Sequence, residues 1–240
     1  MHKCFYGYDM KVGILELSSS ESHHLCNVMR ARMGSAVTVL NGKGFHAYGT
    51  LAVADAKCAR IRIERMDKFE YPSCPITLLQ AVLKSSNNDH IVCEATAIGV
   101  SEIIFFETQN TECKLRGKID NKLLHWKQTA IEACKQSGNP FLPKISYFEK
   151  LEFISLLPFG IKLFGGLKEN SQPIKKVLSS HLPKSNICIA IGPEGDFSQS
   201  EYAYLTRNDF IECRLTRHNV LRSETAVIYA LSVLDQLTNF

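Results

Sequence analysis

The sequence of 240 residues predicts an α/β protein with a small β-rich domain, residues 1–71, and a larger domain, residues 76–240, where strands and helices alternate. Short runs rich in Val, Ile and Thr fill the first part and are separated by turn residues. The linker Tyr71-Pro72-Ser73-Cys74-Pro75 follows, and its prolines interrupt regular structure on both sides. From residue 76 apolar strand-like runs alternate with helical stretches, which predicts a parallel sheet covered by helices.

The first domain is expected to hold four strands and one early helix. The strands are predicted at residues 12–17, 36–40, 45–53 and 58–66, with a turn at Asn41-Gly42-Lys43-Gly44. Ser18 and Glu21 have the spacing of a capping box, and Leu25, Val28 and Met29 would form the apolar side of the helix that follows. Short strands that close on one another predict a small barrel.

The second domain is expected to hold five strands, at residues 76–82, 102–106, 161–164, 187–191 and 211–215. Helices are predicted at residues 89–98, 121–136 and about 224–237, the last with Ser223 as its N-cap. Ser198 and Glu201 form a second capping box.

Composition excludes several classes of protein. An apolar fraction of 45% with 22% charged residues is typical of a folded globular chain. No segment has the roughly 18 apolar residues that a membrane-spanning helix needs, and Lys3 and Asp9 interrupt any signal-peptide core. The nine cysteines contain no C-x-x-C pair and are interpreted as free thiols. We expect no metal site, because the adjacent His23 and His24 would point in different directions on a helix.

Positive charge is concentrated in two regions. Residues 1–71 hold ten Lys or Arg against seven Asp or Glu, whereas the remainder holds 18 against 17. Within that remainder, residues 111–137 form a second basic stretch. Two such regions fit a polyanion that lies across both domains. The alternative is that both are ordinary solvated faces.

Ligands of open α/β sheets bind beyond the carboxyl ends of the strands, and three loops there are distinctive. They are Gly165-Gly166, residues 192–197 and residues 217–224. Glycines let the backbone approach a ligand closely, but no dinucleotide or P-loop motif is present. Gly192-Pro193-Glu194-Gly195 alone could be a simple turn, and Arg222 could merely pair with Glu224 or Glu194. Glu194, however, has no routine structural role in front of a capped helix.

Two motifs in these loops resemble those of the RsmE family, the 16S rRNA (uracil-N3)-methyltransferases of the SPOUT class. One is Ile191-Gly-Pro-Glu-Gly-Asp-Phe-Ser198 with Glu201, and the other is Val220-Leu-Arg-Ser-Glu-Thr-Ala226. Weaker matches at residues 23–30, 41–44, 132–137 and 143–145 extend the resemblance along the chain.

The resemblance implies a PUA-like N-terminal barrel (residues 1–71) and a SPOUT domain (residues 76–240) with a deep trefoil knot. It also implies a cytoplasmic homodimer that methylates RNA of the small (30S) subunit with S-adenosyl-L-methionine (SAM). The implied SAM-binding residues are Phe164, Gly165, Gly166, Ile191, Gly192, Pro193, Glu194, Gly195, Leu215, Val220, Leu221, Arg222, Thr225 and Ala226. We assign catalytic roles to Glu194 and Arg222. For RNA binding we expect Arg30, Arg32, Lys43, Lys122 and Lys127.

The sequence departs from the family pattern at five positions. Asp196 replaces a glycine, and Glu94, Ala97, Asn110 and Asn139 replace a lysine, a glutamate and two arginines. We expect Asp196 beside the presumed pocket and the other four departures mainly on the RNA side, which leaves cofactor binding intact and the RNA target or its affinity open.

Two alternatives follow: a SPOUT enzyme for another RNA or position, and a non-catalytic RNA-binding assembly factor. His125 and Trp126 could stack on a base, although a buried Trp126 is the expected outcome.

Overall fold

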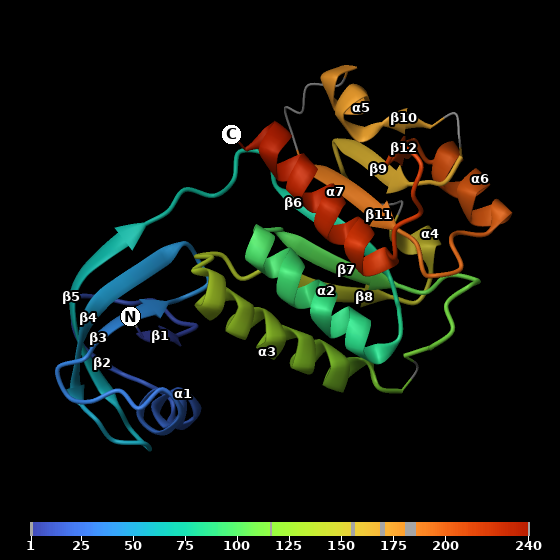
Figure 1. The fold of residues 1–240 in the computed structure, drawn as a ribbon. Helices are drawn as coiled ribbons and strands as arrows, with labels where there is room; N and C mark the ends of the chain where they lie inside the picture. The colour runs from blue at the N-terminus through green and yellow to red at the C-terminus, as the bar shows by residue number, and fades with distance from the viewer. Residues whose placement is uncertain (1, 116, 155–156, 169–170, 181–185, 240) are drawn as a thin grey trace. The chain divides into compact units, whose positions relative to one another are not determined.

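The computed structural model describes residues 2–115, 117–154, 157–168, 171–180 and 186–239 (Figure 1). Their internal contacts divide the chain into two units. The first comprises Met1–Tyr71 and Ile131–Leu142, and the second comprises Pro72–Ala130 and Pro143–Phe240. The sequence did not indicate that residues 131–142 contribute to the first unit.

The first unit is built on a five-stranded sheet in the order β1-β3-β4-β5-β2. Strand β1 is parallel to β3, and the other neighbours are antiparallel. The elements are β1 (His2–Phe5), β2 (Gly13–Glu16), α1 (Ser19–His23), the π-helix η1 (His24–Val28), β3 (Ala36–Leu40), β4 (Phe45–Val53) and β5 (Arg60–Lys68). The predicted strands at residues 36–40 and 45–53 are confirmed. The strand predicted at 12–17 is one residue shorter at each end, and the one predicted at 58–66 begins and ends two residues later. Strand β1 was missed, because four residues give little alternation and the strand is formed by pairing with β3.

The early helix differs from its prediction in two ways. Ser18 caps α1 by accepting a hydrogen bond from the Glu21 backbone, but the capping box is only half formed. The Glu21 carboxylate instead accepts from the Phe5 backbone N–H at 2.9 Å and from Lys135 Nζ at 3.0 Å. The helix then widens into a π-turn, so the expected three- and four-residue spacing fails. Leu25 is buried as predicted, whereas Val28 is 61% exposed.

The second unit contains a seven-stranded sheet in the order β10-β12-β9-β11-β6-β7-β8, and all of its pairs are parallel. Its strands are β6 (Ile76–Ala81), β7 (Glu102–Phe106), β8 (Lys144–Phe148), β9 (Ile161–Gly165), β10 (Gln172–Pro173), β11 (Ile187–Ile191) and β12 (Ile211–Arg214). All five predicted strands are confirmed. The two that were missed, β8 and β10, lie at the edges of the sheet.

Helices α2 (Ser85–Ile98), α3 (Ile119–Ser137), α4 (Leu151–Ile154), α5 (Ile174–Ser180), α6 (Gln199–Arg207) and α7 (Ser223–Thr238) follow the strands. Helices α2 and α7 lie side by side, and α7 packs on β6 and β11 (Figure 1). Every residue of β6 and of β11 is buried, as expected for central strands covered on both faces. In the described part of the chain, no helix combines the length and the hydropathy needed to cross a membrane.

The central position of β11, between β9 and β6, determines where a ligand can bind. From β6 the chain proceeds outward through β7 and β8, and then continues on the other side of β6 with β9. Such a change of direction opens a crevice at the carboxyl ends of the strands.

Candidate functional site

The three loops selected from the sequence converge on one cavity of about 720 Å³. It lies at the carboxyl ends of β9, β11 and β12, the edge predicted for ligand binding. A neighbouring hollow of about 830 Å³ is more open, and no glycine lines it. The three-loop cavity is therefore the better candidate for a small-molecule site.

Eleven of the fourteen expected cofactor-binding residues line this cavity. They are Gly165, Gly166, Ile191, Gly192, Pro193, Glu194, Leu215, Val220, Leu221, Arg222 and Ala226. The other three do not: Phe164 is fully buried beside Tyr202, Gly195 faces Asn110, and Thr225 is exposed on α7.

Eight further residues line the cavity and were not among the expected binding residues. They are Leu167, Asp196, Arg214, Thr216, Arg217, His218, Asn219 and Ser223. Four of the eight belong to the segment between β12 and α7, where no periodicity or glycine indicates which residues face the cavity. Its position directly after a parallel strand was the available signal.

Gly166 is required by a close contact between β9 and β12. A Cβ atom at this position would lie 2.2 Å from Oε1 of Glu212. That oxygen also accepts a hydrogen bond from Ser171 Oγ at 2.8 Å, so the carboxylate is held in place. The glycine therefore allows the loop to pass Glu212 and form the wall of the cavity.

Asp196 stands where the family pattern has glycine, and its φ of 58° is the left-handed conformation that glycine tolerates best. Its carboxylate accepts from the Phe197 backbone N–H at 2.8 Å and from the Tyr202 hydroxyl at 2.9 Å. Burial, together with the adjacent carboxylate, raises the pKa of Tyr202, so the hydroxyl remains a donor. Local hydrogen bonds thus stabilise an aspartate in this conformation.

Asn110 contacts the same loop directly. Its side-chain Nδ2 donates to the carbonyl oxygens of Gly195 at 3.0 Å and Asp196 at 2.9 Å. Asp196 lines the cavity, as its place in the motif predicted. The expectation that the lost arginine at Asn110 falls on the RNA side does not hold, because Asn110 contacts the loop on the cofactor side. The other departures lie elsewhere: Glu94 and Ala97 are on α2, and Asn139 forms a turn with Phe141.

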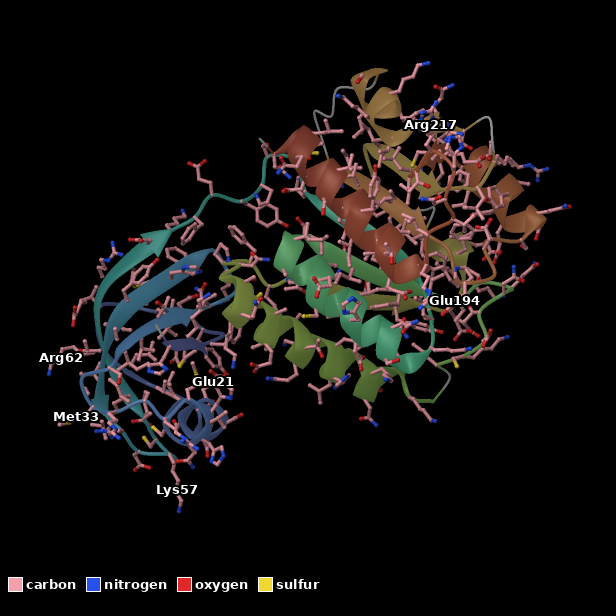
Figure 2. All side chains as sticks on the ribbon, viewed as in Figure 1. Glu21, Met33, Lys57, Arg62, Glu194 and Arg217 are labelled. Atoms are coloured by element: carbon pink, nitrogen blue, oxygen red, sulfur yellow. The ribbon has the colours of Figure 1, made fainter. Side chains whose placement is uncertain are left out.

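Glu194 and Arg222, the two expected catalytic residues, both line the cavity with exposed side chains. Among the described residues neither forms an ion pair, so Arg222 does not pair with Glu224 or Glu194. Arg217 also lines the cavity and lies well apart from Glu194 (Figure 2). Both catalytic candidates are therefore free to meet a ligand.

Arg222, not Ser223, is the N-cap of α7, so the predicted cap is wrong by one residue. Ser223 is the first residue of the helix, and its hydroxyl donates to the Gly192 carbonyl at 2.8 Å. The capping box of Ser198 and Glu201 in front of α6 is confirmed.

The expected RNA-binding residues fall into both units. In the first unit Arg30, Arg32 and Lys43 are exposed; Arg30 has a φ of 53°, and Lys43 pairs with Asp9 at 3.1 Å. In the second unit Lys127 is exposed on α3 and Lys122 is half-buried. All five belong to the basic regions identified from the sequence.

The remaining side-chain predictions concern Trp126, the histidines and the cysteines. Trp126 is fully buried, stacks on Phe105 at 4.0 Å and donates to Asp89, so it cannot stack on a base. Within the described residues, His23 and His24 belong to no group that could hold a metal ion. All nine cysteines are free thiols.

Comparisons with known proteins fit this geometry. Residues 70–235 match the family described as an RNA methyltransferase domain, and residues 17–64 match an RNA methyltransferase PUA domain. The ribosomal RNA small subunit methyltransferase E 2 of Borreliella burgdorferi is 28% identical over 222 residues, with 90% of this chain and 88% of the relative covered. The ribosomal RNA small subunit methyltransferase E of Mesomycoplasma hyopneumoniae is 31% identical over 176 residues, with 71% and 73% covered.

A solved structure shares the fold. It is a methyltransferase from Legionella pneumophila in complex with SAM, which has a TM-score of 0.89 and 26% identity and covers 98% of this chain and 96% of its own. The family resemblance of the two loop motifs is thereby confirmed. The chain belongs to the RNA methyltransferase family that includes the ribosomal RNA small subunit methyltransferases E.

Proposed function

We propose that this chain methylates N3 of a specific uridine in the 16S rRNA of the small (30S) subunit and uses SAM as methyl donor. The convergence of three loops on one cavity at the carboxyl edge of the parallel sheet is the observation that carries the proposal. The relatives named for small-subunit rRNA methylation and the SAM-bound relative of the same fold support it.

The residues of the cavity fit SAM. Its volume of about 720 Å³ is within the usual range for a cofactor of this size. At Gly165, Gly166 and Gly192 the backbone itself forms the wall of the cavity. Apolar surface for the cofactor comes from Ile191, Leu215 and Leu221. When bound, SAM supplies an electrophilic methyl group.

The protein has two tasks in this reaction, because uracil N3 carries a proton at neutral pH. One is to accept that proton or orient its acceptor, a role we assign to Glu194. The other is to stabilise the negative charge of the ring or a phosphate, which we assign to Arg222. General-base assistance contributes about 10²–10⁴-fold, whereas holding two reactants in line removes roughly 7–11 kcal/mol of a barrier. Positioning is thus the larger contribution.

The RNA is proposed to contact Arg30, Arg32 and Lys43 in the first unit and Lys122 and Lys127 in the second. Cations at the protein surface bind phosphates of the RNA and thereby release the counterions that those phosphates had attracted. The match of residues 17–64 to an RNA methyltransferase PUA domain supports a role of the first unit in RNA binding.

The resemblance to the SPOUT class supports three further parts of the proposal. They are a homodimer, a closed PUA-like barrel and a deep trefoil knot in the second domain. The insertion of β11 between β9 and β6 is compatible with such a knot. A ribosomal RNA substrate places the enzyme in the cytoplasm.

Substitution of the two catalytic candidates tests the proposal. We expect Glu194→Gln and Arg222→Ala each to lower methyl transfer by at least about 100-fold, while titration calorimetry shows SAM binding close to that of the wild type. Arg207→Ala, an exposed arginine on α6 outside the cavity lining, is the matched control and should keep full turnover. Full turnover in both cavity variants would refute the assignment.

A further inference from the structure

One buried polar residue of the central sheet is not explained by packing. Gln80 is fully buried in β6, whose other residues are apolar except for the buried Thr77 near the start of the strand. Burying an amide is costly unless it forms hydrogen bonds. The amide nitrogen of Gln80 donates to the Ala81 carbonyl at 2.7 Å and to Ser223 Oγ at 3.0 Å. Its oxygen, Oε1, has no partner among the described residues.

These contacts fix which atom donates at each step. The Ala81 carbonyl only accepts, so the amide nitrogen of Gln80, not its oxygen, faces it. Ser223 has a single hydroxyl proton and gives it to the Gly192 carbonyl at 2.8 Å. Its oxygen must therefore accept from Gln80. The bonds run in one direction, from Gln80 through Ser223 to Gly192, and we name this chain of three residues the clasp.

The clasp joins three elements at the cavity. Gln80 is on β6, Ser223 begins α7, and Gly192 follows β11. Gly192 and Ser223 both line the cavity, whereas Gln80 lies behind them. Glu194 is two residues beyond Gly192, and Arg222 directly precedes Ser223. The clasp therefore connects the two backbone segments that carry the catalytic candidates.

We propose that Gln80 and Ser223 are positioning residues for methyl transfer, which hold the loop of Glu194 against the helix start that carries Arg222. This inference rests on the proposed function, because it assigns the clasp to that same site. Neither residue needs to touch the reacting atoms. Their effect is to fix the width of the pocket and the relative position of Glu194 and Arg222, which is where positioning contributes most to a reaction.

The test is a double-mutant cycle with Gln80→Met, Ser223→Ala and the double variant. SAM affinity is measured by calorimetry, and kcat and KM for SAM are measured by methyl transfer. Each single variant should weaken SAM binding about ten-fold, because one break leaves a buried partner unpaired. The double variant should lose little more SAM affinity than either single variant, because all three variants break the same run of hydrogen bonds. Ser223→Thr retains the hydroxyl and should restore wild-type affinity.

Thr77→Val is the matched control, because Thr77 is buried on the same strand at its other end. It should leave SAM affinity unchanged even if the melting temperature shifts. The proposed role of the clasp would be overturned if the losses of SAM affinity in the two single variants added up in the double variant. It would also be overturned if the single variants bound SAM and turned over like the wild type. If Gln80→Met does not fold, the comparison of SAM affinity between Ser223→Ala and Ser223→Thr tests the proposal without it. A wild-type chain that neither binds SAM nor transfers methyl groups would overturn the proposed function itself.

Discussion

The two sheets of this chain bury their residues in different ways. Along β5 of the first unit, buried Ile61 and Ile63 alternate with exposed Arg60 and Arg62. Along β11 of the second unit, all five residues are buried. A sheet with one open face offers a broad surface, whereas a sheet covered on both faces offers a ligand only the ends of its strands.

The buried polar groups of the two units also differ, because one unit buries an ionised side chain and the other buries neutral ones. In the first unit Lys135 lies between the carboxylates of Glu21 at 3.0 Å and Glu132 at 2.7 Å. In the second unit the clasp is a chain of neutral hydrogen bonds, and Glu194, Arg217 and Arg222 line the cavity with exposed side chains. Buried ion pairs can thus stabilise a unit at a place where no ligand enters. At a binding site, neutral hydrogen bonds can hold the backbone while exposed charged side chains remain available to the ligand.

The largest effect is expected from Lys135→Met, which leaves the buried carboxylate of Glu21 without its cation. Burial lowers the pKa of Lys135, but the bonds to Glu132 and Glu21 outweigh it and raise the pKa, so the side chain is charged. Breaking a buried pair costs about 3–5 kcal/mol, and the free energy of unfolding in denaturant should fall by that amount. Because the folded pKa of Lys135 is raised, the contribution of its charge is present below the unfolded pKa of lysine and is lost as the pH rises through the folded pKa.

Lys127→Met on the same helix is the control, because Lys127 is exposed. It should change the free energy of unfolding by less than about 0.5 kcal/mol. Equal stability of the two variants would show that the first unit does not depend on its buried charge.

A smaller effect is expected from Asn110→Ala, which removes two hydrogen bonds to the loop of Glu194. Each net bond is worth about 0.5–1.5 kcal/mol, so calorimetry should show SAM affinity lowered by about ten-fold. Asn110→Asp should be at least as damaging, since a carboxylate would face two carbonyl oxygens. Wild-type affinity in both variants would mean that the loop holds its shape without Asn110.

The smallest effect is expected from Arg30→Ala and Arg32→Ala in the first unit. Each should reduce by about one the slope of log affinity for RNA against log salt concentration, with SAM affinity unchanged. Lys57→Ala, another exposed cation of that unit, should leave the slope as it is. A change of SAM affinity in the arginine variants would contradict the separate roles of the two units.

The sequence predicted most of the parallel sheet, because its central strands are continuous apolar runs such as residues 187–191. It did not predict β1, β8 or β10, which are edge strands whose residues, apart from the buried Cys4, are only partly buried or exposed. The loops of the cavity were predicted from glycines and from their place after a strand. Gln80 was not selected, because one glutamine in an apolar strand has no pattern of its own and its partner lies 143 positions away. Arg217 and His218 line the cavity, but they were predicted only as members of the loop 217–224 and not as binding residues.

Methyl transfer from labelled SAM to small ribosomal subunits, taken from cells that lack this protein, tests the proposed function most directly. The modified nucleoside is then identified by mass spectrometry. The proposed function predicts one product, N3-methyluridine, in 16S rRNA. A methyl group on another nucleoside or another RNA would show that the enzyme has a different target. No incorporation, with SAM binding retained, would contradict the claim and leave an RNA-binding factor that keeps the pocket.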